Sequence, residues 1–74
     1  MEKKVLSIIK DTFELEEAHV DISQNNCIKW DSLGHLNLIL EIEAEFDVSF
    51  DPEEIADIKS ANDILTILKA RNKI

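Results

Sequence analysis

The sequence predicts an all-α fold, a small four-helix bundle with three longer helices and one short third helix. Its apolar residues recur at the three- and four-residue spacing of helices rather than in alternation. One glycine and one proline in 74 residues leave little of the turn chemistry that strands require. This length predicts a single domain, residues 1–74, whose thin core leaves no room for a deep catalytic cleft.

The first helix is expected to run from Glu2 to Leu15. Its apolar positions fall on one half of the helical wheel and its charged positions on the other, which is typical of a surface helix with one buried face. A long connection with many polar residues follows, from Glu16 to Trp30. In a helical bundle, a loop of this length can carry the chain back along the first helix.

Capping residues mark the next two helices. Asp31 is placed to cap a second helix that begins at Ser32 and runs to about Asp47. Asp51 precedes Pro52, and proline is favoured at the first helical position because its missing N–H has no intrahelical partner there. This pair predicts the start of the short third helix.

The last helix is predicted to begin after Ser60. Asp63 follows three residues later, the spacing of a capping box. Basic residues near the carboxyl end complement the helix dipole: Lys69, Arg71 and Lys73.

The second helix has two apolar stripes. One lies within an arc of about 100° and is predicted to face the core: Leu38, Ile39, Ile42 and Phe46. The other begins beside Ser32, about 120° away: Leu33, Leu36, Leu40 and Ala44. This second stripe either belongs to the core as well, since a small bundle can bury most of a helix, or is a partly exposed strip that contacts another molecule.

The net charge of -8 excludes nucleic acid and anionic lipid as expected partners and favours basic proteins. Residues 41–57 contain eight acidic side chains and no basic one. Like charges four residues apart destabilise a helix, so this uncompensated segment favours a docking surface over an ordinary solvated face. The predicted docking residues are Leu36, Leu40, Glu41, Glu43, Glu45 and Asp47.

Cys27 is the only cysteine, which excludes an internal disulfide and a cysteine-built metal site. The acidic residues lack the spacing of a calcium-binding loop, so no metal site is predicted. The sequence has no run resembling a signal peptide or a membrane span. We therefore expect a cytoplasmic monomer.

Two segments, WDSLGHLNL at 30–38 and EIEAEF at 41–46, closely resemble the acyl carrier protein family. That family consists of four-helix bundles with an Asp-Ser-Leu motif at the amino end of the second helix. The resemblance covers essentially the whole chain, including the long first loop, the short helix at Pro52 and the opening of the last helix at Ser60.

The resemblance implies that Ser32 is the attachment point of 4'-phosphopantetheine, moved from coenzyme A by a phosphopantetheinyl transferase. The thiol of this arm would hold an acyl group as a thioester. Asp31 would help the transferase to hold magnesium, and Leu33 and Leu36 would contact the arm or a partner. The implied partners are the transferase, an acyl- or aminoacyl-loading enzyme, and downstream synthases with basic docking patches. A helix start at Ser32 suits this chemistry, because free N–H groups there stabilise a phosphodiester.

Three departures bear on the pathway. Fatty-acid carriers usually have glycine at the position of Lys29 and acidic residues at the positions of Gly34 and Asn37. These departures favour a discrete carrier for a polyketide, peptide or other specialised pathway. Within the family, the alternatives are a fatty-acid carrier and a D-alanyl carrier.

Two other classes of function compete with a carrier. An unmodified helical docking module would use the acidic face alone. A hydrolase built on Ser32 and His35 would lack the strained Gly-x-Ser-x-Gly turn, and His35 falls on the core side of the wheel, where a structural role is expected. The sequence therefore predicts a carrier protein that acts as a partner of enzymes and has no catalytic activity of its own.

Overall fold

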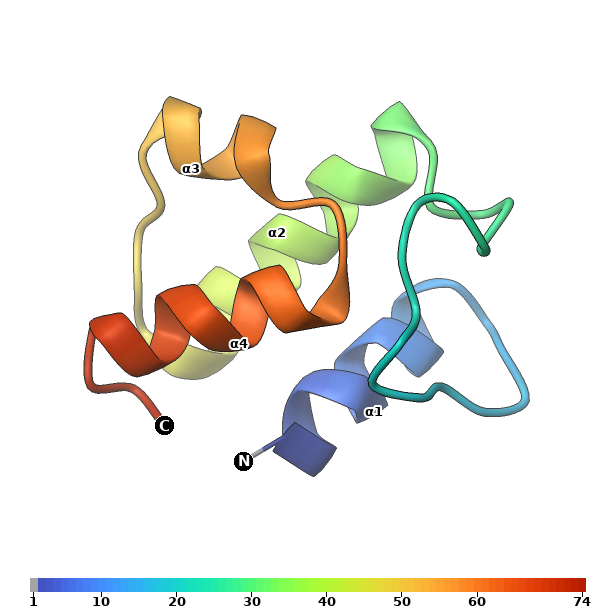
Figure 1. The fold of residues 1–74 in the computed structure, drawn as a ribbon, viewed down its shortest axis with the longest axis horizontal. Coiled ribbons are helices and arrows are strands. Elements are labelled where there is room, and N and C mark those ends of the chain that lie inside the picture. Colours follow the sequence, from blue (N-terminus) through green and yellow to red (C-terminus); the bar gives the residue numbers. More distant parts are fainter. Residues whose placement is uncertain (1) are drawn as a thin grey trace.

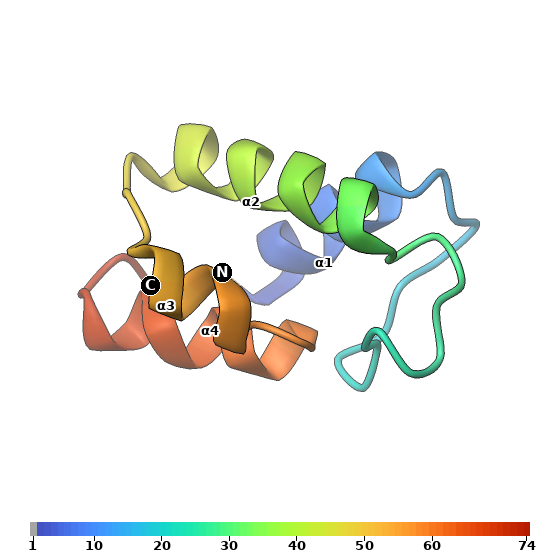
Figure 2. The same ribbon diagram turned by 90° about the horizontal axis from the view of Figure 1, so that it is seen from above.

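The computed structural model describes residues 2–74, and in that range the chain forms four α-helices, the all-α bundle that the sequence predicts (Figure 1). These are α1 (Glu2–Thr12), α2 (Ser32–Phe46), α3 (Pro52–Asp57) and α4 (Ala61–Ala70). Figure 2 shows α2 along one side of the bundle and α4 along the opposite side, and α1 packs against both. No helix within residues 2–74 combines the length and the apolar character needed to cross a bilayer.

The predicted helix starts are confirmed. The Ser60 hydroxyl accepts the N–H of Asp63 at 3.2 Å at the start of α4, and the Glu54 carboxylate accepts the N–H of Asp51 at 2.9 Å before α3. The capping box of α4 differs from the usual one in a single bond. The Asp63 carboxylate accepts the N–H of Lys59 at 2.9 Å, instead of the N–H of the capping residue Ser60.

The end of the first helix was harder to predict, because a non-glycine residue with a left-handed backbone follows the last residue of α1, α2 and α4 by one or two positions. These residues are Glu14, Asp47 and Asn72, with φ values of 53°, 53° and 59°. After α1, the N–H of Leu15 bonds to the carbonyl of Lys10 at 2.9 Å, as in a Schellman motif. The first helix therefore ends three residues earlier than expected, since the glycine that usually marks this motif is absent.

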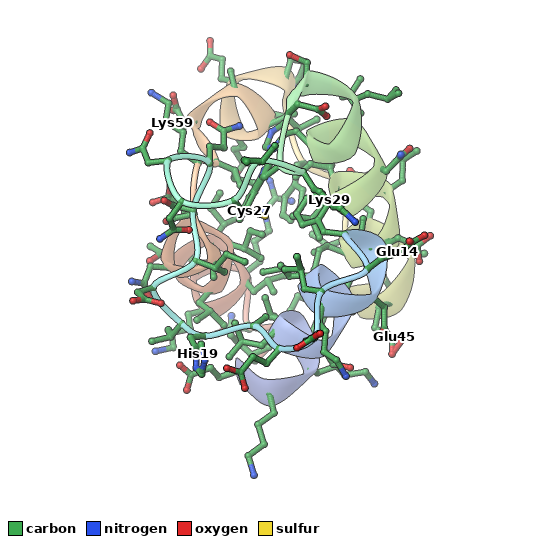
Figure 3. The ribbon with its side chains drawn as sticks, turned by 90° about the vertical axis from the view of Figure 1, so that its right-hand side faces the viewer. Glu14, His19, Cys27, Lys29, Glu45 and Lys59 are labelled. Carbon is green, nitrogen blue, oxygen red and sulfur yellow. The ribbon has the colours of Figure 1, made fainter. Side chains whose placement is uncertain are left out.

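The long connection between α1 and α2 is attached to the start of α4. The N–H of Gln24 bonds to the carbonyl of Lys59 at 2.9 Å, and the N–H of Ala61 bonds to the carbonyl of Ile22 at 3.0 Å. Figure 3 looks onto the end of the molecule that this loop crosses, with Cys27 and Lys29 on its last part. Four side chains of this connection are buried in the core: Phe13, Ile22, Cys27 and Trp30.

The core receives side chains from three of the helices and from the loops. Its buried members are Val5, Ile9, Phe13, Ile22, Cys27, Trp30, Leu38, Ile39, Ile42, Phe50, Ile58, Ala61, Ile64, Leu65 and Leu68. One predicted core residue differs, because Phe46 is only half-buried. It is the last residue of α2, where the chain turns away at Asp47, and Phe50 returns into the core instead.

Candidate functional site

The turn that leads into α2 presents Ser32. Asp31 caps the helix as predicted: its Oδ1 accepts the N–H of Gly34 at 2.8 Å and its carbonyl accepts the N–H of His35 at 2.8 Å. Ser32 is the first helical residue and is exposed, and its hydroxyl has no hydrogen-bond partner within residues 2–74. The hydroxyl is therefore accessible at the positive end of a 15-residue helix.

His35 is buried directly behind this turn. The indole Nε1–H of Trp30 donates to His35 Nδ1 at 3.0 Å, and His35 Nε2 lies 2.8 Å from the carbonyl oxygen of Ile55 in α3. An indole N–H can only donate and a carbonyl can only accept, so the imidazole proton must be on Nε2. Both ring nitrogens are thus engaged away from Ser32. This confirms the structural role predicted for His35 and leaves it no role as a base for a Ser32 nucleophile.

Gly34 lies where the loop backbone approaches α2 closely. A Cβ at this position would be 2.4 Å from the carbonyl oxygen of Lys29 and 2.9 Å from a ring carbon of Phe13, whereas real Cβ contacts are essentially never below 3.0 Å. Glycine is therefore required by close packing. Close packing thus gives a second reason for the missing acidic side chain, and the interpretation of Gly34 as a marker of the pathway stays a prediction.

The second apolar stripe of α2 is exposed, so the alternative that it belongs to the core is wrong. Its exposed fractions are 71% at Leu33, 53% at Leu36 and 63% at Leu40. Two further large apolar side chains are exposed, both in the long loop: Ile28 at 97% and Val20 at 40%. In an irregular loop, no periodicity separates apolar residues that anchor the chain from those that face solvent.

The acidic residues of α2 have different roles. The Glu43 carboxylate is half-buried and accepts the N–H of Phe50 at 2.8 Å, so it stabilises the loop after α2, and the docking role predicted for it stays a prediction. Glu45 is exposed and forms an ion pair of 2.7 Å with Lys4 of α1. Glu41 is exposed without an ion pair in the described part of the chain, and Asp47 is exposed at the left-handed end of the helix.

Basic residues from outside the acidic segment offset part of its charge. Besides Lys4, Arg71 pairs with Glu54, donates to the carbonyl of Ser49 at 2.7 Å and lies 5.7 Å from the ring centroid of Phe50. Arg71 thus connects the end of α4 to α3 and to the loop before it. In residues 2–74, no three His, Cys, Asp or Glu side chains are grouped as metal ligands would be.

Curated relatives match nearly the whole chain. An acyl carrier protein from Syntrophus aciditrophicus is 36% identical over 74 residues, 97% of this chain and 92% of that protein. An acyl carrier protein from Rickettsia bellii is 35% identical over 71 residues, 93% of this chain and 88% of that protein. No family model matches the sequence.

A solved structure from Mycobacterium tuberculosis, described as that of a candidate acyl carrier protein, shares the fold. Its TM-score is 0.83 at 23% identity, and the match covers 93% of this chain and 95% of that one.

Proposed function

Because this chain belongs to the acyl carrier protein family, we propose that Ser32 bears a 4'-phosphopantetheine arm on which the protein holds an acyl or aminoacyl group for partner enzymes. Proteins of this family are carriers rather than enzymes. The observation that carries the proposal is the exposed hydroxyl of Ser32, without a hydrogen bond in residues 2–74, at the first position of α2.

The residues around Ser32 fit a phosphodiester. A helix start directs unpaired N–H groups and a partial positive charge toward an anion, and the Asp31 cap fixes where α2 begins. Asp31 uses Oδ1 for the cap, so Oδ2 is the oxygen that we assign to the magnesium ion of the transferase. When bound, the arm supplies a thiol that carries the cargo as a thioester. The exposed Leu33 beside Ser32 offers an apolar contact for the arm or a partner.

We assign docking to the exposed face of α2 that continues from this serine. Leu36 and Leu40 provide apolar contacts, and the exposed carboxylates of Glu41, Glu45 and Asp47 attract basic patches on partner enzymes. Such enzymes would be the transferase, a loading enzyme and downstream synthases. Glu45 would have to exchange its pairing with Lys4 for one with the partner.

For the pathway, we propose a specialised one in the cytoplasm, with a polyketide, peptide or related product. With Gly34 explained by packing, this assignment depends on the neutral Asn37, which is exposed in α2, and on the exposed Lys29 before the turn. Both make the start of the docking face less acidic than in the usual fatty-acid carrier.

Intact mass tests the attachment directly. After incubation with coenzyme A, magnesium and a broad-specificity phosphopantetheinyl transferase, the protein should gain the mass of one phosphopantetheine. Ser32→Ala should gain nothing, and the control Ser7→Ala, at an exposed serine of α1, should be modified like the unchanged protein. An unchanged mass under conditions that load a reference carrier would leave the unmodified docking module as the better explanation.

The pathway assignment is tested by Asn37→Glu. If the neutral position weakens contact with a basic patch, the loaded variant should be a better substrate for a fatty-acid ketosynthase. One exposed ion pair contributes about 0.2–1 kcal/mol, so kcat/KM should rise about 1.4- to fivefold at low salt and less at moderate salt. Asn62→Glu, at an exposed position of α4, adds the same charge elsewhere and should have no such effect. If the unchanged protein already matches a fatty-acid carrier, the housekeeping assignment replaces ours.

A further inference from the structure

His35 connects three parts of the chain that are distant in sequence: the end of the long loop, α2 and α3. We propose that His35 is a positioning residue, which fixes the orientation of the Ser32 turn through Trp30 and connects that turn to α3 through Ile55. The inference rests on the proposed attachment at Ser32, because it concerns how that serine is presented to the transferase.

The first step is the anchoring of Trp30, two residues before Ser32. Its side chain is buried, with ring centroids 5.5 Å from Phe13 and 6.3 Å from His35. Its backbone N–H bonds to the carbonyl of Cys27 at 3.0 Å. Apolar packing resists removal of the indole from the core but has little direction, so the bond from Nε1–H to His35 Nδ1 sets the rotation of the ring. The orientation of the Trp30 ring therefore limits the conformation of the backbone that leads into Asp31 and Ser32.

The second step is the connection to α3. This helix has six residues and none of them is buried, so few apolar contacts hold it to the bundle. The bond between His35 Nε2–H and the Ile55 carbonyl, at 2.8 Å across 20 residues of sequence, is one of its polar connections, and the pairing of Glu54 with Arg71 is another. A displacement of α3 would therefore pull on the imidazole that orients Trp30.

The chemistry of the imidazole explains why this position holds histidine. One ring supplies an acceptor on one edge and a donor on the other, and a neutral histidine satisfies both neighbours at once. An aliphatic residue of similar volume would remove both bonds, and the larger cost would fall on the buried indole N–H, because the Ile55 carbonyl is only partly buried.

Two amide variants separate the two bonds. Asparagine places an oxygen close to where Nδ1 lies, so His35→Asn should keep the bond from Trp30 and lose the one to Ile55. Glutamine places its NH₂ close to where Nε2 lies, so His35→Gln should keep the bond to Ile55 and lose the one from Trp30. His19→Gln, at the exposed histidine of the loop, is the matched control.

The readouts are kcat and KM for Ser32 modification by a broad-specificity transferase with coenzyme A, amide exchange in residues 52–58, and the fluorescence of Trp30. For His35→Gln we expect kcat to fall about two- to tenfold, the range for one neutral hydrogen bond, with KM unchanged because the exposed face of α2 is intact. The indole emission should also shift. For His35→Asn we expect nearly unchanged kcat, and exchange in α3 that is faster by a similar factor.

A purely structural histidine would give a different pattern. If His35→Gln and His35→Asn reduce thermal stability but leave kcat equal to that of the His19→Gln control, or if both reduce kcat equally, the positioning role is wrong. Should both variants unfold, Trp30→Phe decides by the kcat criterion, because it keeps an aromatic ring while it removes the indole donor together with part of the ring volume. Failure of the unchanged protein to be modified would instead contradict the attachment proposal itself.

Discussion

Leu38→Ala is expected to lower the free energy of unfolding by about 2–5 kcal/mol, because it removes a fully buried side chain from the centre of α2. A domain of this size has only about 3–5 kcal/mol to lose, so the variant should be largely unfolded at room temperature. Urea titration followed by circular dichroism measures the effect. Of the substitutions considered, this one should be the most damaging to the fold.

Leu36→Ala provides the matched control, since it removes the same atoms two residues earlier in the same helix. Leu36 is 53% exposed, so its truncation should change stability by about 0.5 kcal/mol or less. Phe46→Ala should fall between the two, because Phe46 is half-buried. Similar losses for Leu36→Ala and Leu38→Ala would show that the two stripes of α2 are not divided between solvent and core.

Gly34→Ala is expected to destabilise the protein by about 1–3 kcal/mol, the usual cost of excess volume in a packed site. Alanine favours a helix over glycine by about 1 kcal/mol, so propensity alone predicts the opposite sign. We expect the contact to outweigh the propensity, because the new Cβ would lie 2.4 Å from the backbone carbonyl of Lys29. This carbonyl belongs to a loop held by backbone hydrogen bonds, so it cannot rotate away as a side chain could.

The control for this substitution is Asn37→Ala, at an exposed position of the same helix, where the same propensity argument predicts a small gain in stability. Denaturation midpoints of the two variants give the comparison. Equal or greater stability of Gly34→Ala would mean that the loop at Lys29 moves aside at little cost, and would favour the interpretation of Gly34 as a marker of partner choice.

Several features were determined by the sequence alone. The all-α class, the starts of α2, α3 and α4, and the buried stripe at Leu38, Ile39 and Ile42 follow from local rules. Caps and periodic burial act within one or two turns of a helix, so the residues that encode them are close together in sequence. The position of Ser32 directly after its cap at Asp31 belongs to the same class, because an N-cap interaction spans only three residues.

Other features were decided only by the tertiary structure. The sequence placed eight acids without a base at 41–57, but Lys4 and Arg71 reach that segment from α1 and α4. The close approach of the Lys29 carbonyl to Gly34, which gives a packing reason for a neutral residue there, was also not visible in the sequence. The bonds of His35 to a loop tryptophan and to a carbonyl in α3 likewise had no local signal. Each of these contacts joins two segments that come together only when the chain folds, so it is set by the packing of the whole molecule. Helix caps and apolar stripes, in contrast, are set by residues that are near one another in the sequence.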